Sequence, residues 1–197
     1  MGFRKVLQER RIVLDVGHSE NDKGAYSRFL GVSEFDYNND VANIIVKKWD
    51  DKRATLLKNI RRDYMSLPDD LNVLDPYLIV SLHCNSFRDE SANGTECLYF
   101  HKSSMGVKIA NEFVSSFSKI GFRNRGPKPV KLGDRGHYQL RHTKATNVIV
   151  EPGFFSNEKD CAILEDKELI ADTYIKTIKR LLDGKLWIWE KFWCRWM

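Results

Sequence analysis

Short apolar runs alternate with amphipathic stretches along most of the chain. Four of these runs are too short for helices and are rich in β-branched or aromatic residues, so each predicts a strand: residues 11–16, 77–82, 95–100 and 147–150. A further short strand is predicted at residues 54–57. The run YLIVSL at 77–82 is apolar at almost every position, which is typical of a central strand covered on both faces.

Between the predicted strands, apolar residues recur at helical spacing. One stripe, interrupted only by Lys48, consists of Val41, Ile44, Ile45 and Trp49. A second helix is predicted after a cap at Ser103 or Ser104 and before Gly121, and its inner face is expected to contain Ile109, Ala110, Phe113, Val114 and Phe117. One or two helices are predicted between residues 157 and 182, ended by Gly184, with an inner face of Ile170, Tyr174, Ile178 and Leu181.

This alternation of strands and helices predicts an α/β domain with a mostly parallel sheet. The chain has 197 residues, 42% of them hydrophobic, which suffices for one domain with a core of its own. We find no internal repeat and no internal linker. In sheets of this kind, functional groups gather at the carboxyl ends of the strands.

The net charge of the chain excludes few classes of partner. The formal net charge of +5 suits an anionic partner such as nucleic acid, phospholipid headgroups or cell-wall polymer, and it equally serves solubility alone. We do not expect nucleic acid as a partner, because no motif for binding it is present. The four cysteines form no CxxC pair, which argues against a cysteine zinc site. Cys84 and Cys97 are expected to be small buried hydrophobes.

The first residues, MGFRKVLQERR, bear on where the chain is made. They are basic but lack the apolar stretch and cleavage site of a secretory signal. No segment approaches the ~18 apolar residues that are needed to span a bilayer. We therefore expect a soluble chain made in the cytoplasm, or a secreted or periplasmic one if a leader is missing from this sequence.

Three ionisable residues stand where predicted strands end. His18 follows the strand at 11–16 after a glycine, His83 follows YLIVSL, and Glu151 closes NVIV. Because the carboxyl ends of parallel strands meet at one edge of a sheet, we expect the three side chains to converge. Glu34 is predicted near the N-terminus of a helix, where a carboxylate is electrostatically favoured.

Each of these residues also has a purely structural interpretation. His18 alone is compatible with a solvated histidine, and Glu34 with a stabiliser of the first helical turn. His83 and Glu151 are harder to explain in that way, because a polar group beside a buried strand needs a partner or a function. Together, two histidines and a glutamate form a donor set suited to zinc, and a further glutamate near the ion suits a general base.

The remaining histidines are weaker candidates. His137 and His142 stand in the segment GHYQLRHTK, which we predict to be a polar loop. They are expected either to face the cleft and stabilise negative charge or to be solvated. His101 is expected at the surface.

Five segments, in this order, resemble the zinc-dependent N-acetylmuramoyl-L-alanine amidases of the Amidase_3 class, which includes bacterial autolysins and phage endolysins. They are IVLDVGHSE, the loop from Gly24 to Glu34, IVSLHCNS, NGTECLYF and LRHTKATNVIVEPGFFSNEKD. The resemblance implies a single domain with a twisted sheet of about six strands flanked by helices. It also implies one catalytic Zn²⁺ and hydrolysis of the amide between N-acetylmuramic acid and L-alanine in peptidoglycan. His18, Glu34 and His83 match the metal ligands of the family, and Glu151 matches its catalytic carboxylate.

The chain departs from the pattern of this family at two places. Val16 stands where the family usually has proline. The arginine-containing stretch that follows the second strand is matched only loosely by LLKNIRRD. The second departure leaves the substrate specificity open.

The composition changes abruptly after Gly184. We therefore divide the chain into a catalytic domain, residues 1–184, and a cationic, aromatic tail, residues 185–197. Helical spacing of the aromatic residues in KLWIWEKFWCRWM favours either contact with an anionic membrane surface or packing of the tail against the domain.

A single catalytic domain without an export signal favours a monomeric endolysin that stays in the cytoplasm until host lysis. The alternatives are an exported autolysin, another zinc peptidoglycan hydrolase such as a peptidase or deacetylase, and a non-catalytic module that binds the cell wall or a membrane.

Overall fold

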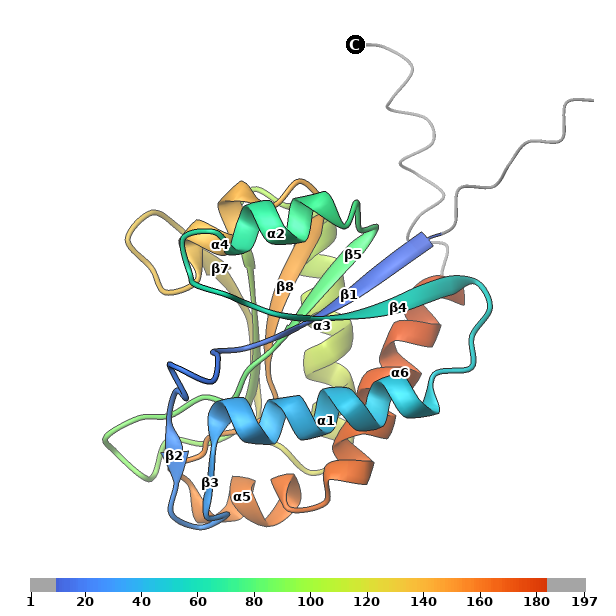
Figure 1. The fold of residues 1–197 in the computed structure, drawn as a ribbon. Helices are drawn as coiled ribbons and strands as arrows, with labels where there is room; N and C mark the ends of the chain where they lie inside the picture. The colour runs from blue at the N-terminus through green and yellow to red at the C-terminus, as the bar shows by residue number, and fades with distance from the viewer. Residues whose placement is uncertain (1–9, 184–197) are drawn as a thin grey trace, which may run out of the picture.

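A mixed sheet runs through the part of the chain that the computed structural model describes, residues 10–183 (Figure 1). Its strand order is β4-β1-β5-β8-β6-β7. The pairs β4–β1, β1–β5, β5–β8 and β6–β7 are parallel, and only β6–β8 is antiparallel. The strands are β1 (Arg10–Val16), β4 (Ala54–Ile60), β5 (Leu78–Leu82), β6 (Thr95–Phe100), β7 (Asn124–Val130) and β8 (Thr146–Glu151).

Helices cover both faces of this sheet (Figure 1). On one face, alternate residues of β1 and β5 pack into a large core with three long helices, which are α1 (Glu34–Lys48), α3 (Ser104–Lys119) and α6 (Lys167–Asp183). On the other face, Val13 and Ile79 pack against α2 (Leu67–Val73), and Ile149 packs against Leu140 of α4 (His137–His142). A short hairpin of β2 (Tyr26–Ser27) and β3 (Val32–Ser33) precedes α1, and α5 (Glu158–Leu164) precedes α6.

The predicted α/β class, with a mostly parallel sheet flanked by helices, is confirmed. All five residues of β5 are buried, as expected of a central strand. The Ser103 side chain caps α3 by accepting a hydrogen bond from the Gly106 N–H, and the five residues predicted for its inner face are buried. The segment 157–182 forms two helices with the predicted inner face.

The polar loop predicted around His137 and His142 is wrong, because residues 137–142 form the helix α4. This helix has six residues and buries only Gln139 and Leu140, so its sequence carries too short an apolar stripe to mark it. The sequence pattern does not predict strand β7 either, because this strand contains Pro127 and Pro129. A strand tolerates proline at the edge of a sheet, and β7 is an edge strand.

The predicted tail at 185–197 lies outside the described residues, so its two interpretations and the division at residue 184 stay predictions. Among the helices within residues 10–183, none combines the length and the apolar character that crossing a membrane requires.

Candidate functional site

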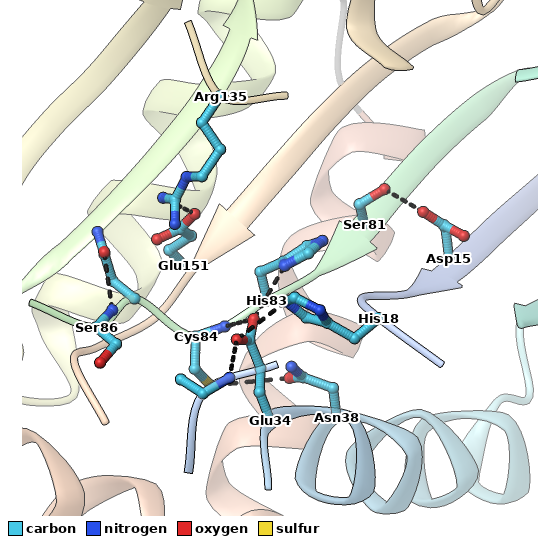
Figure 2. A network of polar contacts seen from close by, with 12 residues as sticks. Asp15, His18, Glu34, Asn38, Ser81, His83, Cys84, Ser86, Arg135 and Glu151 are labelled. Carbon is cyan, nitrogen blue, oxygen red and sulfur yellow. Dashed lines mark hydrogen bonds and ion pairs between the residues drawn. The ribbon is translucent and has the colours of Figure 1, made fainter. Parts of the chain in front are cut away.

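The residues predicted at strand ends do converge. His18 follows β1, His83 follows β5 and Glu151 is the last residue of β8, and these three strands are neighbours with parallel directions. Their carboxyl ends therefore open into one cleft of about 500 Å³, which His18, Glu34, His83 and Glu151 all line. Figure 2 shows the two imidazoles and the Glu34 carboxylate pointing toward one another.

Glu34 lies between the two histidines. It is the first residue of α1, after the Ser33 cap, and is only 4% exposed. Its Oε1 lies 2.9 Å from His83 Nδ1 and accepts a hydrogen bond from the Cys84 N–H, and its Oε2 lies 3.2 Å from His18 Nε2. One ligand atom from each of the three residues lies within 4.8 Å of the others, which is compact enough for a single metal ion.

The electrostatics of this cluster favour a charged carboxylate. Burial pushes the pKa of Glu34 upward, but hydrogen bonds and charge from His18 and His83 outweigh it and hold the pKa far below its usual range. Burial opposes a charge on His18, yet Glu34 beside it raises the His18 pKa. Two imidazoles and one carboxylate are a donor set that catalytic zinc sites use, so these residues fit that ion.

Two glycines make room for the imidazole rings. A Cβ atom on Gly17 would stand 2.6 Å from His83 Cε1, and one on Gly24 would stand 2.6 Å from His18 Cδ2. Gly24 also has a φ of +71°, a backbone conformation that costs little only for glycine. His18 itself has a φ of +68°, which is uncommon for a residue with a side chain. The local backbone is therefore shaped around the position of the His18 ring.

A second carboxylate, that of Asp22, contacts His18 on the side of the ring away from Glu34. Asp22 Oδ2 lies 3.4 Å from His18 Nδ1, the ring nitrogen that faces away from Glu34, and it also accepts a hydrogen bond from Arg61. A carboxylate on the far nitrogen of a histidine fixes the orientation of its ring. The sequence interpretation missed both residues, because Asp22 lies between two of the segments that resemble the family and Arg61 lies in LLKNIRRD, which matches the family only loosely.

Glu151 has two unequal carboxylate oxygens. The residue is 1% exposed, and Arg135 donates a hydrogen bond to its Oε1 (Figure 2). Its Oε2 has no hydrogen-bond partner within residues 10–183. Burial raises the pKa of Glu151, and the charges of Arg135 and His83 oppose that rise only in part. A buried carboxylate with one unpartnered oxygen in a cleft is suited to accepting a proton.

A row of polar side chains lies on the sheet behind the cleft. Asn59, Asp15 and Ser81 are register partners on the adjacent strands β4, β1 and β5. Asn59 and Ser81 donate hydrogen bonds to the buried Asp15 carboxylate, and Gln139 of α4 donates another of 2.9 Å. This row ties α4, and with it the loop that carries Arg135, to the centre of the sheet.

The other histidines lie away from this arrangement. Neither His137 nor His142 is among the residues that line the cleft, and the Nδ1 of His142 bonds to the Tyr138 carbonyl. His101, which was expected at the surface, is partly exposed, and its Nδ1 bonds to the Val130 carbonyl.

Comparison with known proteins agrees with the resemblance. Residues 12–180 match the Amidase_3 family, described as N-acetylmuramoyl-L-alanine amidase. This chain belongs to the Amidase_3 family. A probable cell wall amidase, LytH of Staphylococcus aureus, is 32% identical to it over 166 residues, which cover 82% of this chain and 53% of LytH. The chain therefore spans about half the length of the curated relatives that it matches.

Solved amidase structures share the Amidase_3 fold with this chain. The catalytic domain of CwlV, an N-acetylmuramoyl-L-alanine amidase from Bacillus (Paenibacillus) polymyxa var. colistinus, is 27% identical with a TM-score of 0.72, over 89% of this chain and 99% of that one. An N-acetylmuramoyl-L-alanine amidase from Clostridium difficile 630 is 24% identical with a TM-score of 0.77, over 90% of this chain and 98% of that one. The likeness to CwlV also supports the family assignment, whereas the likeness to the Clostridium difficile amidase supports the fold alone.

Proposed function

We propose that this Amidase_3 domain hydrolyses the amide bond between N-acetylmuramic acid and L-alanine in peptidoglycan, with one Zn²⁺ held by His18, Glu34 and His83 and with Glu151 as the catalytic base. The observation that carries the proposal is the convergence of three metal-type donors and a buried carboxylate with an unpartnered oxygen in one cleft.

Each residue of the cleft has a separate role in such a reaction. A zinc ion, when bound, acts as a Lewis acid that polarises the scissile carbonyl and lowers the pKa of water toward ~7. Glu151 Oε2 takes the proton that the attacking water loses and then delivers it to the leaving nitrogen of L-alanine. Arg135 holds Oε1 and so orients the carboxylate. Asp22 holds the ring of His18 in the orientation that points Nε2 at the cluster.

Digestion of defined muropeptides with and without a chelator tests this proposal. We expect a new L-alanine amino terminus, no new reducing sugar, and loss of activity with the chelator that added zinc restores. Glu151→Ala should keep zinc but lose activity, by about 10²-fold or more for a general base, whereas His83→Ala should lose both. Normal activity of Glu151→Ala would contradict its role. Cleavage within the peptide, or release of acetate, would point instead to the peptidase or deacetylase alternative.

We also propose that the domain serves host lysis as a monomeric endolysin, reaching the cell wall from the cytoplasm. Its net positive charge supports binding to an anionic cell wall. Cells that express the domain should lyse only after the membrane is permeabilised, which turbidity measures. Lysis that proceeds without permeabilisation would favour an exported autolysin.

A further inference from the structure

We propose that Arg61 forms a subsite for a carboxylate on the peptide stem of the substrate, beside the reaction centre. The inference rests on the proposed function, because it places the scissile amide at the His18, Glu34 and His83 cluster. It concerns a residue in the stretch LLKNIRRD, where the sequence departs from the family pattern.

The sheet delivers Arg61 to the cleft in the same way as the two histidines. β4 lies next to β1 and runs parallel to it, so its carboxyl end meets the same edge of the sheet. Arg61 directly follows Ile60, the last residue of β4, and lines the cleft together with His18 and Glu34. Its side chain is only 10% exposed. The guanidinium is therefore part of the cleft wall rather than a solvated surface charge.

The present partner of Arg61 is itself a carboxylate. Arg61 Nη2 donates a hydrogen bond of 2.5 Å to Asp22 Oδ2, and the side chain of Asp22 is 61% exposed. Within residues 10–183, Asp22 is the one hydrogen-bond acceptor of this guanidinium. A guanidinium has five N–H donors in a planar fork that suits carboxylates, so donors remain for a second one. The ring of Tyr64, 5.6 Å from Arg61 Cζ, adds an aromatic wall on the cleft side.

The place of Arg61 beside the His18 ring selects which substrate group can reach it. A single oxygen, Asp22 Oδ2, touches both His18 Nδ1, at 3.4 Å, and the Arg61 guanidinium, at 2.5 Å. A carboxylate on the second stem residue lies one peptide unit beyond L-alanine, roughly 6 Å from the scissile nitrogen. These contacts place the guanidinium beside the outer nitrogen of the His18 ring, in the same cleft as the cluster. A stem that extends from the cluster past this ring brings the carboxylate to Arg61.

Two muropeptides that differ at one group test the subsite. Both carry the stem L-alanyl-γ-D-glutamyl-L-lysine, and the glutamyl α-carboxylate is free in one and amidated in the other. We expect the zinc-loaded protein to prefer the free acid in kcat/KM by about 10- to 100-fold, since hydrogen bonds to charged groups exceed neutral ones by that order. Arg61→Gln should abolish this preference by weakening activity on the acid alone. Equal kcat/KM for the acid and the amide in the wild-type protein would overturn the proposal.

The adjacent arginine provides a matched control. Arg62 is 75% exposed, and it bonds to Asp70 rather than lining the cleft. Arg62→Gln removes the same charge one residue away and should leave the preference for the acid unchanged. If Arg62→Gln abolishes the preference as fully as Arg61→Gln, the effect is one of net charge and the subsite is disproved.

Binding measurements test the subsite independently of the proposed amidase activity. They also distinguish direct binding by Arg61 from an indirect role in positioning His18. Titration calorimetry with the two free stem peptides should give tighter binding of the acid to wild-type protein but not to Arg61→Gln, whether or not the protein has amidase activity. Arg61 could instead act only through Asp22 on His18. In that case Arg61→Gln and Asp22→Asn would both lose zinc and lower activity equally on the two muropeptides, and the proposal would fail.

Discussion

At the residue scale, the absence of a side chain on Gly24 leaves the space in which the His18 imidazole lies. Gly24 has a positive φ, and a Cβ there would overlap the His18 ring. Gly126 has a similar φ, +79°, but open surroundings, with nothing within 4 Å of the place that a Cβ would take. Alanine at Gly126 would change only the stability of the backbone, whereas alanine at Gly24 would also disturb the position of a proposed metal ligand.

We predict that Gly24→Ala and Gly126→Ala each cost about 1 kcal/mol of stability or slightly more, because alanine is disfavoured at positive φ. Only Gly24→Ala should also weaken zinc binding, by about 10-fold or more, because it displaces a ligand. Zinc competition with a chromogenic chelator and urea unfolding measure the two effects. Unchanged zinc affinity in Gly24→Ala would mean that His18 can move without cost.

At the scale of elements, one row of polar residues joins three strands and a helix. The Asp15 carboxylate receives hydrogen bonds from β4, β5 and α4, through Asn59, Ser81 and Gln139. Burial raises the pKa of Asp15, and the hydrogen bonds from Asn59 and Ser81 oppose the rise only in part. A carboxyl whose pKa is higher in the folded state stabilises the fold at low pH and loses that contribution as pH rises through the folded pKa.

We predict that Gln139→Leu destabilises the fold by about 1–3 kcal/mol at pH 8, because the buried Asp15 carboxylate loses a donor. The loss should be smaller at pH 5, because the missing donor raises the Asp15 pKa further and a protonated carboxyl needs fewer donors. Urea unfolding of wild type and variant at both pH values measures this difference. A loss that is larger at pH 5 than at pH 8 would contradict this account of Asp15.

At the scale of the whole molecule, the proposed ion would join elements that are distant in the chain. His18 follows β1, Glu34 begins α1 and His83 follows β5, so a bound ion cross-links the sheet to a covering helix. An ion that binds only the folded state stabilises that state by mass action. The cluster assembles only in the folded chain, since 49 residues separate Glu34 from His83.

We predict that zinc at 100 times its Kd stabilises the domain by about 2.7 kcal/mol, which corresponds to a rise in Tm of roughly 5–10 °C for a domain of this size. Differential scanning calorimetry of chelator-treated and zinc-loaded protein measures the shift. His83→Ala should have a lower zinc-dependent shift or none. Equal Tm values for the wild-type protein in both states would contradict zinc binding at this cluster.

The sequence by itself determined the main elements and the residues at the ends of the strands. Apolar periodicity is a local property, so it identified β1, β5, β6, β8 and the long helices, and parallel strands made the convergence of His18, His83 and Glu151 predictable. It failed for α4 and β7, where a short polar helix and a strand with two prolines lack that periodicity.

Only the tertiary structure decided which partners these residues have. Arg135 reaches Glu151 across 16 residues, Arg61 reaches Asp22 across 39, and Gln139 reaches Asp15 across 124. Nothing local distinguishes these two arginines among the 32 lysines and arginines of the chain. Their importance comes from the cleft that both line and from the carboxylates that they contact. These contacts exist only once the sheet has brought its strand ends together.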